Sequence, residues 1–182
     1  MFRLKIIFLL FLITTLTMLG CSSDEQKKVA HYQRGLAYFD KGEFKSARLE
    51  FKNAIQIDPK YVAAYEKLGE TNLKIGDAQG AFRAYSNLTE LEPENTAAQL
   101  KLATFLILAK EFEDSRKKLD TVLNREPTNV DALLVLAGIL SQEGNLSESE
   151  ATFEKVLEID GQEIRAHLGL AYLLVPQGRV AE

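Results

Sequence analysis

The sequence of 182 residues contains no tryptophan, only two histidines and a single cysteine, Cys21. One cysteine cannot form a disulfide within the chain, and it excludes metal or redox sites built from several cysteines. The phosphate-binding patterns GxxxxGK[ST] and GxGxxG are absent, and no serine stands in a nucleophile turn. We therefore expect a protein that is not an enzyme and has no metal site and no cofactor.

Long runs of positive charge are also absent. The chain has 22 Lys and Arg residues against 26 Asp and Glu residues, and its longest basic run is Arg116 to Lys118. Proteins that bind the phosphate backbone need a basic patch, so we expect no nucleic-acid partner. The apolar share of 46% and the charged share of 26% are typical of a folded chain, here one domain or one repeat array.

The N-terminus has the layout of a bacterial secretory leader. Arg3 and Lys5 precede an apolar stretch from Ile6 to Leu19, which is shorter than the roughly 20 residues that a membrane span needs. Residues 18–21, Met-Leu-Gly-Cys, resemble the lipobox of bacterial lipoproteins. The resemblance implies a signal peptide over residues 1–20, acylation (palmitate) at Cys21 and a membrane lipid anchor. The alternative is a leader cleaved elsewhere, with Cys21 incidental.

By the same resemblance, the residue after the cysteine, Ser22, implies delivery to the periplasmic face of the outer membrane in the cell envelope. We expect residues 21–27 to form a short polar spacer, so that the folded part lies close to the bilayer.

A 34-residue period organises the rest of the chain. Three prolines are spaced by this period, and small or apolar residues recur in register between them. The columns are Gly35, Gly69, Ala103, Ala137 and Ala171; Ala47, Ala81, Ser115 and Ser149; Phe51, Tyr85, Leu119 and Phe153; and Ala54, Leu88, Val122 and Val156. Close helix crossings need such small residues, and the spaces between helices take large ones.

This pattern resembles the tetratricopeptide-repeat (TPR) family, in which each repeat is a pair of antiparallel helices. The resemblance implies an all-α fold, a right-handed helical solenoid, over residues 28–61, 62–95, 96–129 and 130–163, with an incomplete fifth repeat at 164–182. The prolines Pro59, Pro93 and Pro127 then end the second helices. Four glycines end first helices, while Lys110 takes that place in the third repeat; the glycines are Gly42, Gly76, Gly144 and Gly178.

The fifth repeat is predicted to supply one helix, about Ile164 to Val175, whose apolar face has no partner helix. Because solenoids usually end in a polar capping helix, we expect the sequence to be the N-terminal piece of a longer protein. His31 and His167 both stand at the fourth residue of a repeat, where we expect packing roles. Glu148 and Glu150 are predicted to be surface carboxylates near a helix start.

The TPR resemblance implies that the first helices line a groove for partner segments. The candidate groove residues are Tyr32, Leu36, Phe39, Lys67, Glu70, Leu100, Lys101, Thr104, Ile107, Leu134 and Val135. Most are apolar, so we expect a protein or peptide segment that is apolar or amphipathic. The helices around Leu102–Ala109 and Leu133–Leu140 are apolar on nearly every side, and either a ligand or packing within a longer superhelix would cover them.

A lipobox joined to several TPRs resembles the TPR lipoproteins of exosortase (PEP-CTERM) and exopolysaccharide systems. This resemblance implies a membrane-anchored protein–protein interaction scaffold of an envelope assembly, export or sorting system. The alternatives are a pilotin-like or outer-membrane assembly lipoprotein, and the N-terminal TPR region of a larger envelope enzyme.

Overall fold

The computed structural model describes residues 23–179, and it is entirely helical over that range. Cys21 and the leader lie outside the described residues. The chain divides into two compact units, one ending at Thr71 and one beginning at Asn72, and each is described by itself. The all-α prediction is confirmed for the described residues.

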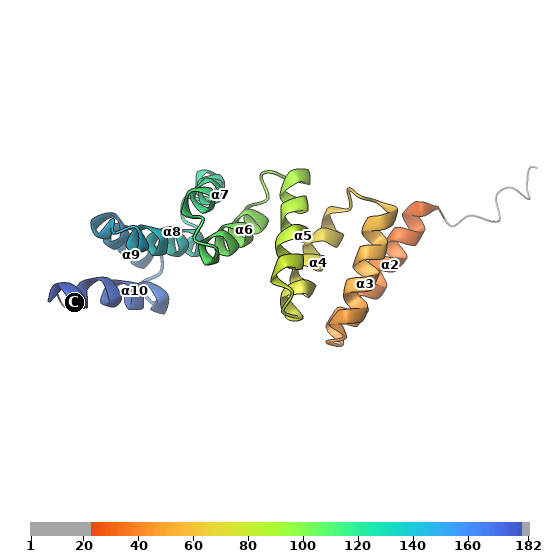
Figure 1. Cartoon of the computed structure of the whole chain (residues 1–182), viewed down its shortest axis with the longest axis horizontal. Coiled ribbons are helices and arrows are strands. Elements are labelled where there is room, and N and C mark those ends of the chain that lie inside the picture. Colours follow the sequence, from red (N-terminus) through yellow and green to blue (C-terminus); the bar gives the residue numbers. More distant parts are fainter. Residues whose placement is uncertain (1–22, 180–182) are drawn as a thin grey trace, which may run out of the picture. The chain divides into compact units, whose positions relative to one another are not determined.

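The first unit is built on an antiparallel helix pair. Helix α2 (Asp24–Asp40) lies against α3 (Phe44–Ile57), and α4 (Val62–Lys74) follows them (Figure 1). The two helices pack closely at Gly35, where a Cβ atom would collide with the ring of Phe51. Glycine is therefore required at this position because the partner helix places an aromatic ring there.

The expected spacer over residues 21–27 is wrong in its second half, because α2 begins at Asp24. The side chain of Ser23 accepts a hydrogen bond from the backbone N–H of Gln26, and the Gln26 side chain accepts one from the backbone N–H of Ser23. This reciprocal capping box satisfies two helix-terminal donors, which favours an early start. Folded structure thus begins almost directly after Cys21.

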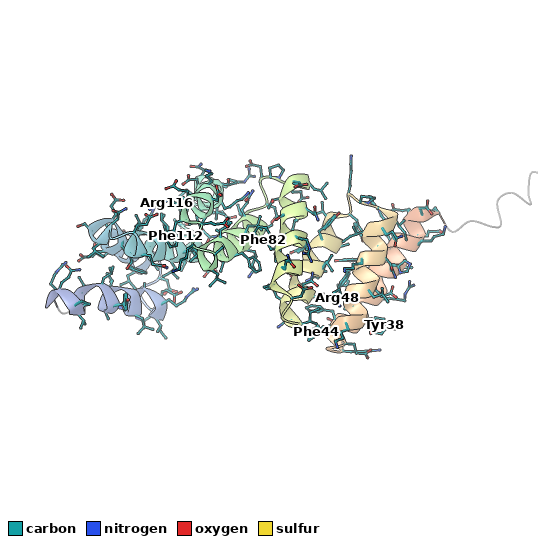
Figure 2. All side chains as sticks on the ribbon, viewed as in Figure 1. Tyr38, Phe44, Arg48, Phe82, Phe112 and Arg116 are labelled. Carbon is teal, nitrogen blue, oxygen red and sulfur yellow. The ribbon has the colours of Figure 1, made fainter. Side chains whose placement is uncertain are left out.

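The second unit repeats the same pairing. Its helices are α5 (Ala78–Leu91), α6 (Thr96–Leu108), α7 (Phe112–Arg125), α8 (Val130–Gln142), α9 (Leu146–Ile159) and α10 (Ile164–Leu174), with a 3₁₀ turn at Val175–Gln177. Helices α6 and α7 form one pair and α8 and α9 the next, and α10 packs on α9 (Figure 1). On α5, Phe82, labelled in Figure 2, meets the ring of Phe105 on α6 edge-on, with 6.0 Å between ring centroids.

Two serines continue the column of small residues that begins at Ala47. The hydroxyl of Ser115 donates to the carbonyl of Ala103 at 2.9 Å, and the hydroxyl of Ser149 donates to the carbonyl of Ala137 at 2.8 Å. Both serines are fully buried. The hydroxyl therefore joins the two helices of a repeat where alanine stands in earlier repeats, with its polar group satisfied.

The four columns are confirmed as core positions in repeats one to four. Phe51, Leu119, Val122 and Val156 are at most 1% exposed, and the alanines that cross them are fully buried. Burial of this kind supplies roughly 25 cal/mol per Å² of apolar surface. The 34-residue period is therefore the period of the core itself.

The turns between helices also agree with the sequence. The four glycines adopt positive φ angles of 69° to 82°, and Lys110 does so too, with φ of 61°. Lys110 is the only non-glycine residue with positive φ among those described. The third turn thus has the same left-handed backbone conformation as the others. It has lysine where the others have glycine, the residue that adopts this conformation without strain.

The predicted packing role of His167 is wrong. Its side chain is exposed and contacts the carbonyl of Gly161 at 3.1 Å through Nε2, because no second helix of the described residues covers that side of α10. His31 is half-buried, and its Nδ1 lies 2.7 Å from a Glu50 carboxylate oxygen. Of the two surface carboxylates, Glu148 is exposed and Glu150 is half-buried beneath Arg179.

Candidate binding surface on the first helices

A pocket of about 600 Å³ lies on the first helices of the second unit. Helix α6 contributes Leu100, Lys101 and Thr104, and α8 contributes Leu134 and Val135. These are five of the six groove residues that the sequence predicts for this part of the chain. Three residues that sequence reasoning missed complete the lining: Asp131, Phe153 and Arg165.

One side of the pocket is formed by an ion pair between Arg165 and Asp131. The guanidinium of Arg165 on α10 donates to Asp131 on α8 at 2.7 Å and to Glu163 through two nitrogens at 2.9 and 2.7 Å. These hydrogen bonds lower the pKa of Glu163 to about 2 and raise that of Arg165. Asp131 and Arg165 stand one repeat apart, so the opposite charges at equivalent places were a signal for this contact.

The sixth predicted residue of this part, Ile107, is not in the pocket. It packs against the core cluster that contains Ala103, Leu119 and Ile139. Thr104 is in the pocket, but its hydroxyl donates to the carbonyl of Leu100 at 2.9 Å. The polar part of Thr104 is therefore occupied within its own helix.

Internal packing covers most of the two helices that are apolar on nearly every side. Leu102, Leu106, Leu133 and Leu140 are each 8% exposed or less. Leu134 and Val135 are half-buried and face the pocket. Packing thus explains most of the apolar surface, and the pocket contains part of the remainder.

The predicted groove residues of the first unit include two that make ring contacts, Tyr32 and Phe39. The Tyr32 ring lies 5.2 Å from that of Tyr61 and 5.7 Å from that of Phe51, between centroids. Burial raises the pKa of both tyrosines. Lys67 lies 5.8 Å from the centroid of the Phe39 ring and binds Glu70 at 2.7 Å. Leu36, between Tyr32 and Phe39 on α2, is half-buried.

Helix α10 and the first residue of the 3₁₀ turn that follows it carry an exposed apolar stripe that the sequence predicted in outline. Ile164, Leu168, Tyr172 and Val175 are between 64% and 78% exposed. They recur at helical spacing and so share one face of the helix. The prediction of an apolar face without a partner is confirmed for the described residues.

Within residues 23–179, no group of three or more His, Cys, Asp or Glu side chains is placed to hold a metal ion. In that same part of the chain, none of the helices combines the length and hydropathy needed to cross a bilayer.

Residues 24–165 match a family model described as the cytochrome c-type biogenesis protein H TPR domain. The chain belongs to this TPR family. No curated protein sequence matches it. The TPR resemblance is thereby confirmed, while the link to exosortase systems stays a prediction.

Solved structures share the TPR fold. MamA is 21% identical, with a TM-score of 0.78 over 85% of this chain and 84% of MamA. The Pseudomonas aeruginosa protein pilF is 20% identical, with a TM-score of 0.69 over 85% of this chain and 71% of pilF. YrrB, described as a TPR protein with an unusual peptide-binding site, is 17% identical, with a TM-score of 0.72 over 85% of this chain and 80% of YrrB. At these identities the likeness shows the fold alone.

Proposed function

We propose that this TPR protein is a membrane-anchored scaffold of a bacterial envelope assembly, export or sorting system, and that it binds segments of partner proteins along its first helices. The observation that carries the proposal is the pocket between Leu100, Leu134 and Arg165, to which α6, α8 and α10 each contribute. Ligand sites in proteins are concave, mostly apolar and edged by a few polar groups, and this pocket has that character. The proposal assigns the chain no reaction of its own.

The anchor in this proposal is an acylated Cys21 on the periplasmic face of the outer membrane. The leader pattern around Arg3, Lys5 and the apolar stretch supports it. So does the start of α2, because its N-cap, Ser23, is separated from Cys21 by Ser22 alone. Several acyl chains hold a protein stably at a membrane, so the first repeat would lie against the bilayer surface.

The system served by the scaffold is, in this proposal, of the exopolysaccharide or exosortase type. The family match favours a second candidate, in which the groove holds a protein during c-type cytochrome assembly. A pilotin-like role and a role as the front end of an envelope enzyme are the remaining alternatives. All four use the same surface and differ in what it binds.

In-cell crosslinking tests the proposal. Photo-crosslinking amino acids at Leu100 and Leu134 should capture a defined envelope protein, and the same group at Leu146, which is 40% exposed on α9, should not. A polysaccharide-export or sorting component supports the scaffold, an apocytochrome the second candidate, and a secretin or pilus protein the pilotin. Capture of only this chain's own polypeptide would refute partner binding.

The anchor is tested in the same cells. Cys21→Ser cannot be acylated, so the protein should leave the membrane fraction and the crosslinks at Leu100 should weaken. Unchanged membrane association of Cys21→Ser would refute the proposed anchor while leaving the groove untouched.

A further inference from the structure

Two lysines at the same register of the repeat have different surroundings. Lys67 binds the carboxylate of Glu70 at 2.7 Å, and this hydrogen bond raises the pKa of Lys67. One repeat later, the equivalent residues are Lys101 and Thr104. Lys101 therefore lacks the counter-ion that Lys67 has, and it forms no ion pair or hydrogen bond with any residue that the structure describes.

The other cation of the pocket is already occupied. Arg165 uses its guanidinium on Asp131 and Glu163. Those two carboxylates balance the charge of Arg165, and Asp131 is in turn held by it. Among the described lining residues, Lys101 is thus the charged side chain without an ion pair, in a chain whose formal net charge is −4.

Next to Lys101 the lining is apolar. Leu100 and Leu134 flank it on α6 and α8, and Phe153 lies deeper, at 6% exposure. The pocket therefore presents one cation beside an apolar surface large enough to take an apolar side chain.

We propose that the pocket binds a peptide segment in which an apolar side chain stands next to a glutamate or aspartate, with the apolar group on Leu100 and Leu134 and the carboxylate on Lys101. This inference rests on the proposed function and names the ligand class of the same surface. Lys101 is a specificity residue in it, because it selects among apolar segments by their charge.

Three matched pools of fluorescein-labelled seven-residue peptides test the inference by fluorescence anisotropy, with the full chain in mild detergent. Each pool has Leu, Val or Phe at two positions and Ser elsewhere, and the pools differ only in a glutamate, a glutamine or a lysine beside the apolar residue. We expect the glutamate pool to bind roughly two- to fivefold more tightly than the glutamine pool, as one exposed ion pair allows. The lysine pool should bind most weakly.

A charge reversal gives the sharper result. Lys101→Glu should invert the order, so that the lysine pool binds best, and Lys101→Gln should remove the preference without inverting it. Lys155→Glu makes the same charge change on an exposed residue of α9 and should leave the order unchanged. Far-UV circular dichroism confirms that each variant is as helical as the parent.

The failures are distinguishable. Equal binding of all three pools, unchanged by Lys101→Glu, would overturn the charge selectivity and leave a groove for apolar segments. Binding of no pool would overturn this inference, and the crosslinks at Leu100 and Leu134 would then decide the proposed function by themselves.

Discussion

The two end helices, α2 and α10, stand at equivalent places in the repeat but expose different surfaces. On α2 the exposed residues include Ala30, Ala37 and Arg34. Arg34 is half-exposed and bonds Glu50 at 3.1 Å, and His31 contacts the same carboxylate. The other four first helices have leucine at the register of Arg34: Leu68, Leu102, Leu136 and Leu170.

Helix α10 keeps the apolar character of an internal helix. Its exposed stripe from Ile164 to Val175 contains no charged side chain. One repeat earlier, Val130 and Leu134 are half-buried and pack against the cluster that includes Ala166 and Leu170. Arg34 lies at the register of Leu170, which is 7% exposed, so the polar face of α2 and the apolar stripe of α10 are different faces of the repeat helix. On α8 the register of the stripe packs against the following helix, whereas on α10 it is exposed.

The largest expected effect compares the cores behind the two end helices. Phe51 is fully buried under Gly35 of α2, and Phe153 is 6% exposed under Gly169 of α10. Phe51→Ala should cost about 3–5 kcal/mol of stability. Phe153→Ala should cost less, because its cavity opens into the pocket. Urea denaturation followed by helix circular dichroism measures both, and equal midpoints would contradict the contrast.

The exposed stripe itself gives the next effect. A buried Leu or similar side chain contributes about 1.5–3 kcal/mol, so the stripe should drive self-association of the purified protein. Leu168→Glu with Tyr172→Lys should reduce association and leave the helix content unchanged. Leu49→Glu, at an apolar residue on α3 that is 59% exposed, is the matched control. Sedimentation velocity measures the result, and identical association of parent and double variant would show that the stripe is inert.

The 34-residue period predicted the fold because it records what each helix must contact. The columns at Phe51 and Ala54 are core positions in every repeat with two described helices, so composition at one position reports packing there. The glycines and prolines identified the ends of the helices for the same local reason. These features depend on contacts within one repeat, and the residues that make those contacts recur every 34 positions in the sequence.

The rest depends on contacts that one repeat does not contain. The Asp131–Arg165 ion pair joins two repeats. Phe153 lines the pocket from a second helix of a repeat, whereas the TPR resemblance places only first helices along the groove. His167 is exposed because its usual cover is absent among the described residues, although its register predicts burial. The start of α2 was missed because the repeat boundary was given more weight than the capping box at Ser23.

A smaller effect concerns the turns between the helices of the second unit. Lys110 has a φ of 61°, a conformation that costs a non-glycine residue about 1–2 kcal/mol. Lys110→Gly should therefore stabilise the second unit by about 1 kcal/mol. Gly144→Ala, at φ of 82°, should destabilise it by a similar amount. Hydrogen exchange should show the change in α6 to α9, and a change confined to α2 and α3 would refute the assignment.

The smallest effect separates the two end helices by pH. Helix α2 is capped by neutral groups, Ser23 and Gln26, whereas the carboxylate of Glu163 caps α10 and binds Arg165. The pKa of Glu163 falls from 4.5 to about 2 in the folded chain, so its stabilising contribution is present above about pH 4.5 and is lost as the pH falls towards 2. Between those values, hydrogen exchange should accelerate in residues 164–174 more than in residues 24–40. Glu163→Gln should remove this pH dependence in α10, since the neutral amide does not titrate; if acid loosened α2 equally, the carboxylate cap would not be the cause.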